Sequence, residues 1–259
     1  MSEINGTFRN GHVELDSSVD WPEGMRVTVF RNREIDESAT KKAAVADQKG
    51  LASRYFQEIR EAWAPFALKY RIVPFCTPVF RHPSVVVIGT NHSDFDPSDI
   101  ERSEAIADRY ASGILEENTF LRHNHKFAIG LRDWCSHAGI AIDAGWIGTN
   151  RCAVQTGSGG IDELKDASHF DGCQSRMDDI LRRLLADLAP KNIILTGKYA
   201  AALFYPSADN KGTKFVDLKP RDELFGSGFS TRLIPIEHPS RKDLFRDKAS
   251  QRLADFLLR

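Results

Sequence analysis

The sequence predicts an α/β protein: a three-layer α/β/α sandwich with a central four-stranded parallel sheet, preceded by a small N-terminal β module. The first observation behind this prediction is a set of four short segments in which an apolar run stops at Gly, Asn or His, as buried parallel strands do. The second is the alternation of strand and helix patterns from Val85 onward, which is typical of right-handed crossovers. The four segments are residues 84–91, 146–151, 192–197 and 233–240, of which the second is the weakest strand.

Composition limits the class of protein. The chain has 259 residues and a formal net charge of −1, so we expect one large core and no general coating of nucleic acid, although a local grip on phosphates stays open. No apolar run approaches the ~20 residues that span a bilayer, and the start lacks a secretory pattern, so we expect a cytoplasmic protein without a membrane partner. The four cysteines form no Cys-x-x-Cys pair, and we expect no metal and no cofactor.

The N-terminal part is predicted to be a β module at residues 1–32. Residues 6–15 alternate around an Asn-Gly turn, residues 21–24 form a second turn, and residues 25–30 alternate again. This stretch resembles the short β modules of bacterial antitoxin-like proteins. A piece this small is not stable alone, so we expect it to pair with a second copy or to dock on the main domain. Residues 33–50, polar and charged, are predicted to be a linker or a loosely ordered helix.

The remaining residues, 51–259, form the predicted main domain. Its expected helices follow from apolar periodicity and from stop signals such as Gly139 and Pro190. They cover residues 51–70, 100–115, 127–138, 173–188, 198–204 and 248–258.

Polar residues at the ends of the four strands predict the functional site. In open α/β sheets, ligands bind just beyond the carboxyl ends of the strands. Asn91, Asn150 and His238 follow three of these strands, so we expect them to converge on one crevice. The tripeptide His82-Pro83-Ser84 repeats the sequence at 238–240, but it precedes its strand and is predicted to be a turn that points away from the crevice.

Four motifs in order resemble those of the uracil-DNA glycosylase superfamily, over the chain from about Val79 to the C-terminus. They are Gly89-Thr90-Asn91, Thr149-Asn150-Arg151-Cys152, the turn Leu195–Ala201, and His238-Pro239-Ser240. The first is closest to the mismatch-specific thymine/uracil branch. The resemblance implies a DNA glycosylase that extrudes a nucleotide into a pocket and leaves an abasic site.

The resemblance also implies roles for individual residues. Asn91 would hold water against C1′, with Asp94 or Asp96 as a base if the loop folds back, although both carboxylates also fit a solvated loop. His238 would hydrogen-bond a base carbonyl where negative charge develops, and the alternative is a plain turn histidine. Asn150 would read the pairing edge of a pyrimidine, and the alternative is a strand-end cap. Gly89, in the first motif, is a further base-binding candidate.

Further residues are implied to stack on the base and to bind DNA. Phe120 is the candidate stacking ring, with Phe95 or a plain core role as the alternatives. The loop after His238 would contact DNA, with Leu244 or Phe245 as a wedge, or would be a solvated charged turn. The DNA-binding candidates are Ser240, Arg241, Lys242 and Leu244.

Departures from the family pattern shape the functional prediction. His92-Ser93 replaces the residues that exclude a 5-methyl group, and residues 93–118 are a long insertion, so we expect a wide pocket. Cys152 and Cys173 stand where iron–sulfur branches carry two ligands, but the upstream pair is missing. We therefore expect a monofunctional glycosylase acting on uracil or on a bulky modified cytosine, for instance in phage DNA as antiviral defence. The alternative is a catalytically weak nucleic-acid-binding or toxin–antitoxin-associated protein that reuses the fold.

Overall fold

The structure is a computed structural model that describes part of the chain. It describes residues 6–9, 12–15, 37–75, 77–90, 126–143, 145–157, 160–209, 214, 217–225 and 228–258. For residues 6–9, 12–15, 37–49, 209 and 241–243 it describes the backbone alone. The chain divides into two compact units, residues 1–40 and 41–259.

The first unit contains a β-hairpin. Strand β1 (Gly6–Arg9) pairs antiparallel with β2 (His12–Leu15), and Arg9 lies opposite His12. The turn expected at Asn10-Gly11 lies outside the described residues. The turn expected at 21–24 and the strand expected at 25–30 lie outside the described residues.

Helix α1 (Glu37–Ala62) begins earlier than apolar periodicity predicts. The expected linker at 33–50 overlaps its first half, so residues 37–50 are helical rather than a separate connection. From Leu51 onward the helix buries one side, including Tyr55 and Ile59, which are 1% and 0% exposed.

The sheet of the second unit has five strands in the order β5-β4-β7-β9-β8, rather than the expected four. Strands β5, β4, β7 and β9 are parallel to one another, and β8 pairs antiparallel with β9 at one edge of the sheet. The parallel strands correspond to the four segments that the sequence predicts. The bounds are β4 Val85–Gly89, β5 Trp146–Asn150, β7 Asn192–Thr196, β8 Arg221–Leu224 and β9 Ser230–Ile236.

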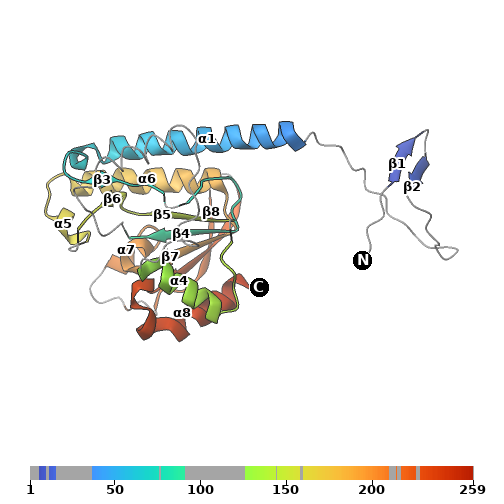
Figure 1. The fold of residues 1–259 in the computed structure, drawn as a ribbon. Helices are drawn as coiled ribbons and strands as arrows, with labels where there is room; N and C mark the ends of the chain where they lie inside the picture. The colour runs from blue at the N-terminus through green and yellow to red at the C-terminus, as the bar shows by residue number, and fades with distance from the viewer. Residues whose placement is uncertain are drawn as a thin grey trace. The chain divides into compact units, whose positions relative to one another are not determined.

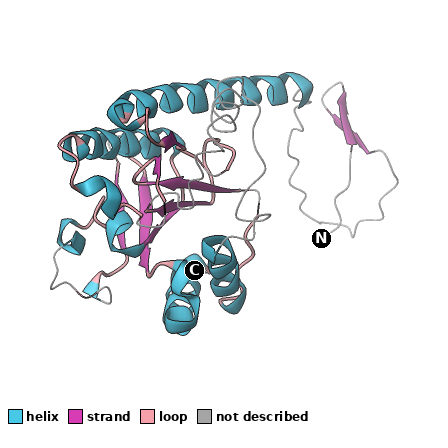
Figure 2. Cartoon of the chain, turned by 60° about the vertical axis from the view of Figure 1, so that its left-hand side comes forward, coloured by secondary structure: helices cyan, strands magenta, loops and turns pink. Residues whose placement is uncertain are grey.

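Helices cover both faces of this sheet, with α1 and α6 on one side and α4 and α8 on the other (Figures 1 and 2). Alternate residues of the same strand enter two separate cores: Val86 and Ile88 join the core under α1 and α6, whereas Val85 and Val87 join the core under α4 and α8. Burial on both faces explains why these strands are continuous apolar runs. The helix bounds are α4 Lys126–His137, α5 Asp162–Lys165, α6 Phe170–Leu188, α7 Gly197–Ala201 and α8 Lys242–Leu257.

The outer edge of β5 is covered by the segment that follows α1. Phe75 forms a bridge with Thr149, and the Thr149 hydroxyl donates to the Pro74 carbonyl at 2.7 Å. This cover removes an open strand edge next to the predicted site. The short elements nearby and elsewhere are β3 Arg71–Ile72 paired with β6 Val154–Gln155, and the 3₁₀ turns η1 Ala64–Phe66, η3 Pro206–Asp209 and η5 Pro239–Arg241.

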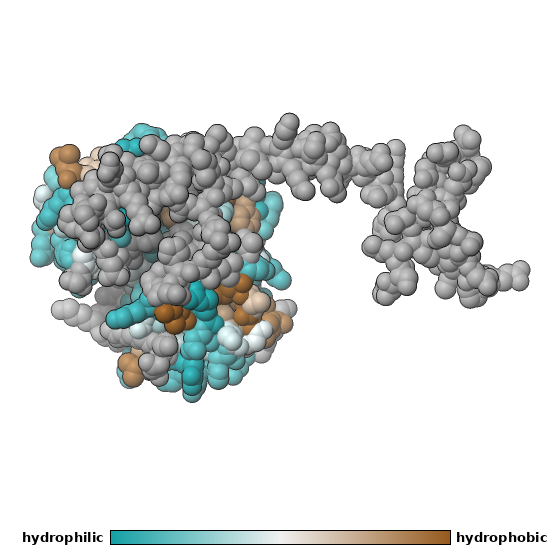
Figure 3. Space-filling view, in the orientation of Figure 1, coloured by the Kyte–Doolittle hydropathy of each residue, from teal (hydrophilic) through white to brown (hydrophobic). Residues whose placement is uncertain are grey.

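The surface over α4 and α8 mixes hydrophilic residues with smaller hydrophobic areas (Figure 3). Phe127, Phe245 and Phe256 are only partly buried against the core under these helices. Within the part of the chain that is described, every helix is too short or too polar to cross a bilayer.

Candidate active site

The carboxyl ends of the parallel strands form one continuous edge, called here the carboxyl edge: Asn150 on β5, Gly89 and Thr90 at β4, Thr196 and Gly197 at β7, and His238 after β9. At its first end Gly89 pairs with Asn150 across the parallel ladder. A Cβ added at Gly89 would overlap the Oδ1 atom of Asn150, so the Asn150 side chain lies directly over the glycine. Only a residue without a side chain permits this approach.

At the other end of the carboxyl edge, Gly197 brings His238 and Thr90 together. Gly197 has a φ of +82°, which favours glycine at this strand-to-helix turn. A Cβ placed on it would lie 3.6 Å from both Cβ and Cδ2 of His238 and 3.9 Å from the Thr90 hydroxyl oxygen. The ends of β4 and β9 therefore meet over the start of α7.

His238 is held by its own loop and by α4. Its Nδ1 atom lies 2.6 Å from the Ser240 hydroxyl oxygen and accepts the Ser240 backbone N–H at 3.4 Å. Its ring meets the Phe127 ring edge-on, with centroids 5.3 Å apart. Pro239, the residue after His238, packs closely against Gly130 of α4: a Cβ added at Gly130 would overlap the Pro239 carbonyl oxygen.

The contacts with Ser240 favour one arrangement of the His238 imidazole. The Ser240 backbone N–H can only donate, so Nδ1 of His238 accepts that bond, whereas the role of Nδ1 towards the Ser240 hydroxyl depends on the tautomer. In the neutral tautomer that accepts at Nδ1, the hydrogen resides on Nε2, which is then the donating nitrogen of the ring.

The structure brings together four of the predicted site residues, Gly89, Asn150, His238 and Ser240, at the carboxyl edge. Leu244 lies in the first turn of α8 and is 76% exposed. Arg241 and Lys242 lie at the junction of η5 and α8, but their side chains are outside the described atoms. Outside the described residues altogether lie Asn91, Phe120, Phe95, Asp94 and Asp96.

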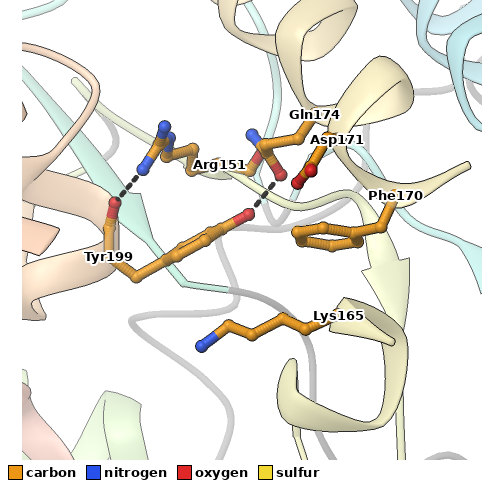
Figure 4. Close-up of a pocket in the computed structure, with 6 residues that line it drawn as sticks. All are labelled: Arg151, Lys165, Phe170, Asp171, Gln174 and Tyr199. Atoms are coloured by element: carbon orange, nitrogen blue, oxygen red, sulfur yellow. Dashed lines mark hydrogen bonds between the residues drawn. The ribbon is translucent and has the colours of Figure 1, made fainter. Parts of the chain in front are cut away.

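A cavity of about 430 Å³ opens beside the carboxyl edge, between α5, α6 and α7 (Figure 4). Its lining begins at Arg151, the residue after Asn150, whereas neither Asn150 nor His238 is among the described residues that line it. The lining residues are Arg151, Lys165, Phe170, Asp171, Gln174 and Tyr199.

One lining residue of this cavity, Arg151, is buried and forms an ion pair with the partly buried Asp178. Arg151 donates to both carboxylate oxygens of Asp178, from Nε at 2.9 Å and from Nη2 at 2.6 Å. Its Nη1 donates to the Tyr199 carbonyl at 2.7 Å, and its guanidinium lies 4.7 Å from the centre of the Tyr199 ring. Gln174 donates to Asp178 at 2.7 Å and accepts the Tyr199 hydroxyl, as Figure 4 shows for the latter contact. We refer to these four side chains as the Arg151 network.

The cysteines near this network are protonated thiols at neutral pH. Burial raises the pKa of the Cys152 thiol to about 12 and also raises that of Cys173 above its usual value. A thiol with such a pKa is neither a nucleophile nor a ready metal ligand near pH 7. Among the residues that the structure describes, no group of three His, Cys, Asp or Glu side chains is arranged to hold a metal ion.

Sequence reasoning missed two features of this site. One is the contact of Phe127 with His238, which periodicity alone assigns to the helix core. The other is the Arg151 network. The sequence signal for this network was Arg151, an arginine inside the Thr149–Cys152 motif. The partners of Arg151, Asp178 and Tyr199, lie 27 and 48 residues further along the chain.

Comparison with known proteins found no relative: no protein-family model and no curated protein matches the chain. An α/β fold by itself hosts many activities. The function must therefore be argued from the residues of the carboxyl edge and their geometry.

Proposed function

We propose that this chain is a monofunctional DNA glycosylase that hydrolyses the N-glycosidic bond of a pyrimidine flipped out of DNA. The observation that carries the proposal is the carboxyl edge itself, with an amide at one end, an imidazole at the other and two glycines between them. The sequence resemblance described above gives the same residues the same roles.

The two proposed base-binding side chains lie along one edge of the sheet. Asn150 ends β5 and His238 follows β9, and β4 and β7 lie between these two strands. Three inter-strand spacings amount to about 14 Å, so a base bound by both side chains would lie above the ends of β4 and β7. Gly89 accommodates the Asn150 side chain above it, and Gly197 has no side chain that would meet His238.

His238 supplies the electrostatic part of the mechanism. When the bond from C1′ to the base breaks, the electron pair stays on the base and negative charge develops on its carbonyl oxygen. We propose that the Nε2–H of a neutral His238, whose ring is held by Ser240, donates a hydrogen bond to that oxygen. This hydrogen bond strengthens as the negative charge on the oxygen grows. Water then adds to C1′, and its proton is released as the abasic sugar forms.

In this proposal Asn150 recognises the base and Asn91 positions the attacking water. The Asn150 amide carries a donor and an acceptor, the complement of a pyrimidine pairing edge. It is 7% exposed, so little water competes for it. Asn91 directly follows Thr90 at the end of β4 and is proposed to hold the attacking water by hydrogen bonding. The residues proposed to act at the glycosidic bond, Asn91 and His238, are not lysines, so we propose hydrolysis without a Schiff base and without strand cleavage.

The proposed substrate is uracil or a bulky modified cytosine, and defence against phage DNA is the corresponding biological role. DNA contacts are proposed for Ser240, Arg241 and Lys242, with the exposed Leu244 filling the space left by the extruded base.

One assay tests the proposal. The full chain is incubated with oligonucleotides that carry uracil, a thymine mismatch, hydroxymethylcytosine or glucosylated hydroxymethylcytosine, and alkali-labile abasic sites and the released base are measured. We expect one of these bases to be excised, and both Asn91→Ala and Asn150→Ala to lower the rate by about 10² or more while DNA binding persists.

The matched control is Asn192→Ala. Asn192 is also a buried asparagine on a parallel strand, but it lies at the start of β7, where its amide donates to the Ser84 carbonyl at 3.2 Å. Its variant should keep full activity. DNA binding without release of any base would overturn the proposal and favour a nucleic-acid-binding protein that reuses the fold.

A further inference from the structure

The Arg151 network is built for rigidity rather than for holding a ligand. Its polar groups already bind one another: Arg151 with Asp178, Gln174 with both Asp178 and Tyr199. The Arg151 side chain is 9% exposed and that of Asp178 is 22% exposed. A buried, bidentate arginine–carboxylate pair contributes fixed geometry more dependably than it contributes net stability.

Hydrogen bonds also fix the backbone at Arg151 and at Cys152. The Arg151 N–H donates to the Gly89 carbonyl at 3.0 Å, and the Arg151 carbonyl accepts the Gln174 amide at 3.2 Å. The next N–H, of Cys152, donates to the Thr90 carbonyl at 2.9 Å. The residue directly before this fixed segment is Asn150.

The network also reaches the turn that supports His238. Arg151 donates to the carbonyl of Tyr199, in a helix that begins at Gly197, where an added Cβ would lie within 4 Å of both His238 and Thr90. Arg151 thus links the end of β5 to the end of β4 through its backbone N–H, and to the helix that follows β7 through its side chain.

We propose that the Arg151–Asp178 ion pair is the positioning device of the carboxyl edge, fixing the β5 end so that Asn150 stays aligned with the base held by His238. This inference rests on the glycosylase function proposed above. A displacement of about 1 Å at a reacting group costs up to 10²-fold in rate, so a pair that touches no substrate has a large effect on turnover.

The test compares two aspartates of the same helix. Asp178→Asn removes the charge that Arg151 binds. Asp187→Asn is the matched control, because Asp187 also lies on α6 and binds an arginine and a tyrosine, Arg54 and Tyr55 of α1, away from the carboxyl edge. Two readouts are taken for each variant: amide hydrogen exchange at Arg151 and Cys152, and kcat and KM for the oligonucleotide whose base the wild type excises.

We expect Asp178→Asn to speed exchange at these two amides by about tenfold or more and to lower kcat by about tenfold with KM within about twofold. Amides between β7 and β9 should exchange as in the wild type, and Asp187→Asn should change neither readout. Arg151→Lys, which keeps the charge but not the bidentate fork, should shift both readouts in the same direction and serves if Asp178→Asn fails to fold.

Two results would overturn the inference: unchanged exchange at Arg151 and Cys152 in both network variants, or an equal loss of kcat in Asp178→Asn and Asp187→Asn. If the wild type excises no base, the glycosylase proposal fails, and the exchange measurement still decides whether the pair positions the strand end.

Discussion

The tripeptide His-Pro-Ser occurs twice in this chain, at opposite ends of the same sheet. At 82–84, before β4, its backbone joins neighbouring turns: the His82 N–H donates to the Leu188 carbonyl at 2.6 Å, and the Pro83 carbonyl accepts the Lys191 N–H at 3.2 Å. At 238–240, after β9, the histidine ring instead binds Ser240 and faces Phe127 and Gly197. We call the first region the amino edge.

The difference teaches that topology decides the role of a short motif. The amino edge uses its polar groups to close connections between strands and helices, and the His82 side chain is left exposed. The carboxyl edge combines glycines that clear space with side chains that reach over them. Ligand sites in open α/β sheets lie at the carboxyl ends for this reason.

Replacing each histidine in turn gives the largest expected contrast. His238→Ala should lower the excision rate by about 10²–10³-fold, because a donor to the developing charge is lost. His82→Ala should keep the rate within about twofold, since no ligand-facing group is removed. Single-turnover cleavage with saturating protein measures both. Similar losses in the two variants would erase the distinction between the edges.

Gly130→Ala should be the next most damaging change. The added Cβ would overlap the Pro239 carbonyl oxygen and lie 2.7 Å from its carbonyl carbon, and backbone atoms cannot step aside cheaply. We expect a loss of about 1–3 kcal/mol in the free energy of unfolding, together with reduced activity as the His238 loop shifts.

The control for that change is Gly172→Ala on α6, where no atom lies within 4 Å of an added Cβ. It should stabilise the helix by about 0.5–1 kcal/mol and leave activity unchanged. Urea unfolding and the cleavage assay together separate the two glycines. Equal stability of the Gly130 variant and the wild type would show that α4 does not brace the loop.

The two serines of the tripeptides sharpen the comparison at a smaller scale. Ser240→Ala removes the hydroxyl beside His238 Nδ1, and we expect the excision rate to fall by about fivefold, the value of one hydrogen bond of about 1 kcal/mol. Ser84→Ala removes a hydroxyl that donates to the Gly145 carbonyl at 3.2 Å, and it should lower stability slightly without changing the rate. A lower excision rate for Ser84→Ala together with an unchanged rate for Ser240→Ala would contradict a site at the carboxyl edge.

The smallest expected effect is a pH dependence near the amino edge. Asp187 accepts hydrogen bonds from Tyr55 and Arg54, while its carbonyl accepts Arg81 at 2.9 Å. Burial opposes ionisation of Asp187, but the hydrogen bonds from Tyr55 and Arg54 outweigh burial and hold the pKa of this carboxyl below its usual 3.8. The stability that its charge contributes is therefore present above pH 3.8 and is lost as the pH falls through the lower folded value.

Asp187→Asn should accordingly be less stable than the wild type near pH 7, by less than about 1 kcal/mol because the pair is partly exposed. The difference should vanish once the pH lies below the lowered pKa of folded Asp187. Denaturant unfolding across this range measures it. A difference that grows as the pH falls would contradict the assigned pKa direction.

The sequence predicts the sheet where burial leaves a pattern and fails where it does not. The strands Val85–Gly89 and Asn192–Thr196 are apolar because both faces are buried, so their ends could be located. Strand β8, Arg221–Leu224, is a mostly exposed edge strand with three charged residues, and it carries no such signal. The first half of α1 was left open between a linker and a helix, because its residues are polar and Ala-rich, which favours a helix through propensity without apolar periodicity.

For the site, sequence order predicts which residues reach the carboxyl edge, because parallel strands all end there. It cannot predict which side chains pair across the fold. Arg151 meets Asp178 and Tyr199 only after β5, α6 and α7 have packed together. Likewise, the position of the Asn150 side chain over Gly89 depends on the register between β4 and β5, which no local pattern encodes.

The most direct test of the central claim is to locate the bound base. The full chain, labelled with ¹⁵N-histidine, is titrated with an oligonucleotide that carries the excised base on a 2′-fluoro sugar, which resists cleavage. The imidazole signal of His238 should shift on binding, while that of His82 should stay unchanged. Binding that leaves His238 unperturbed, or that shifts His82 instead, would contradict a base site at the carboxyl edge.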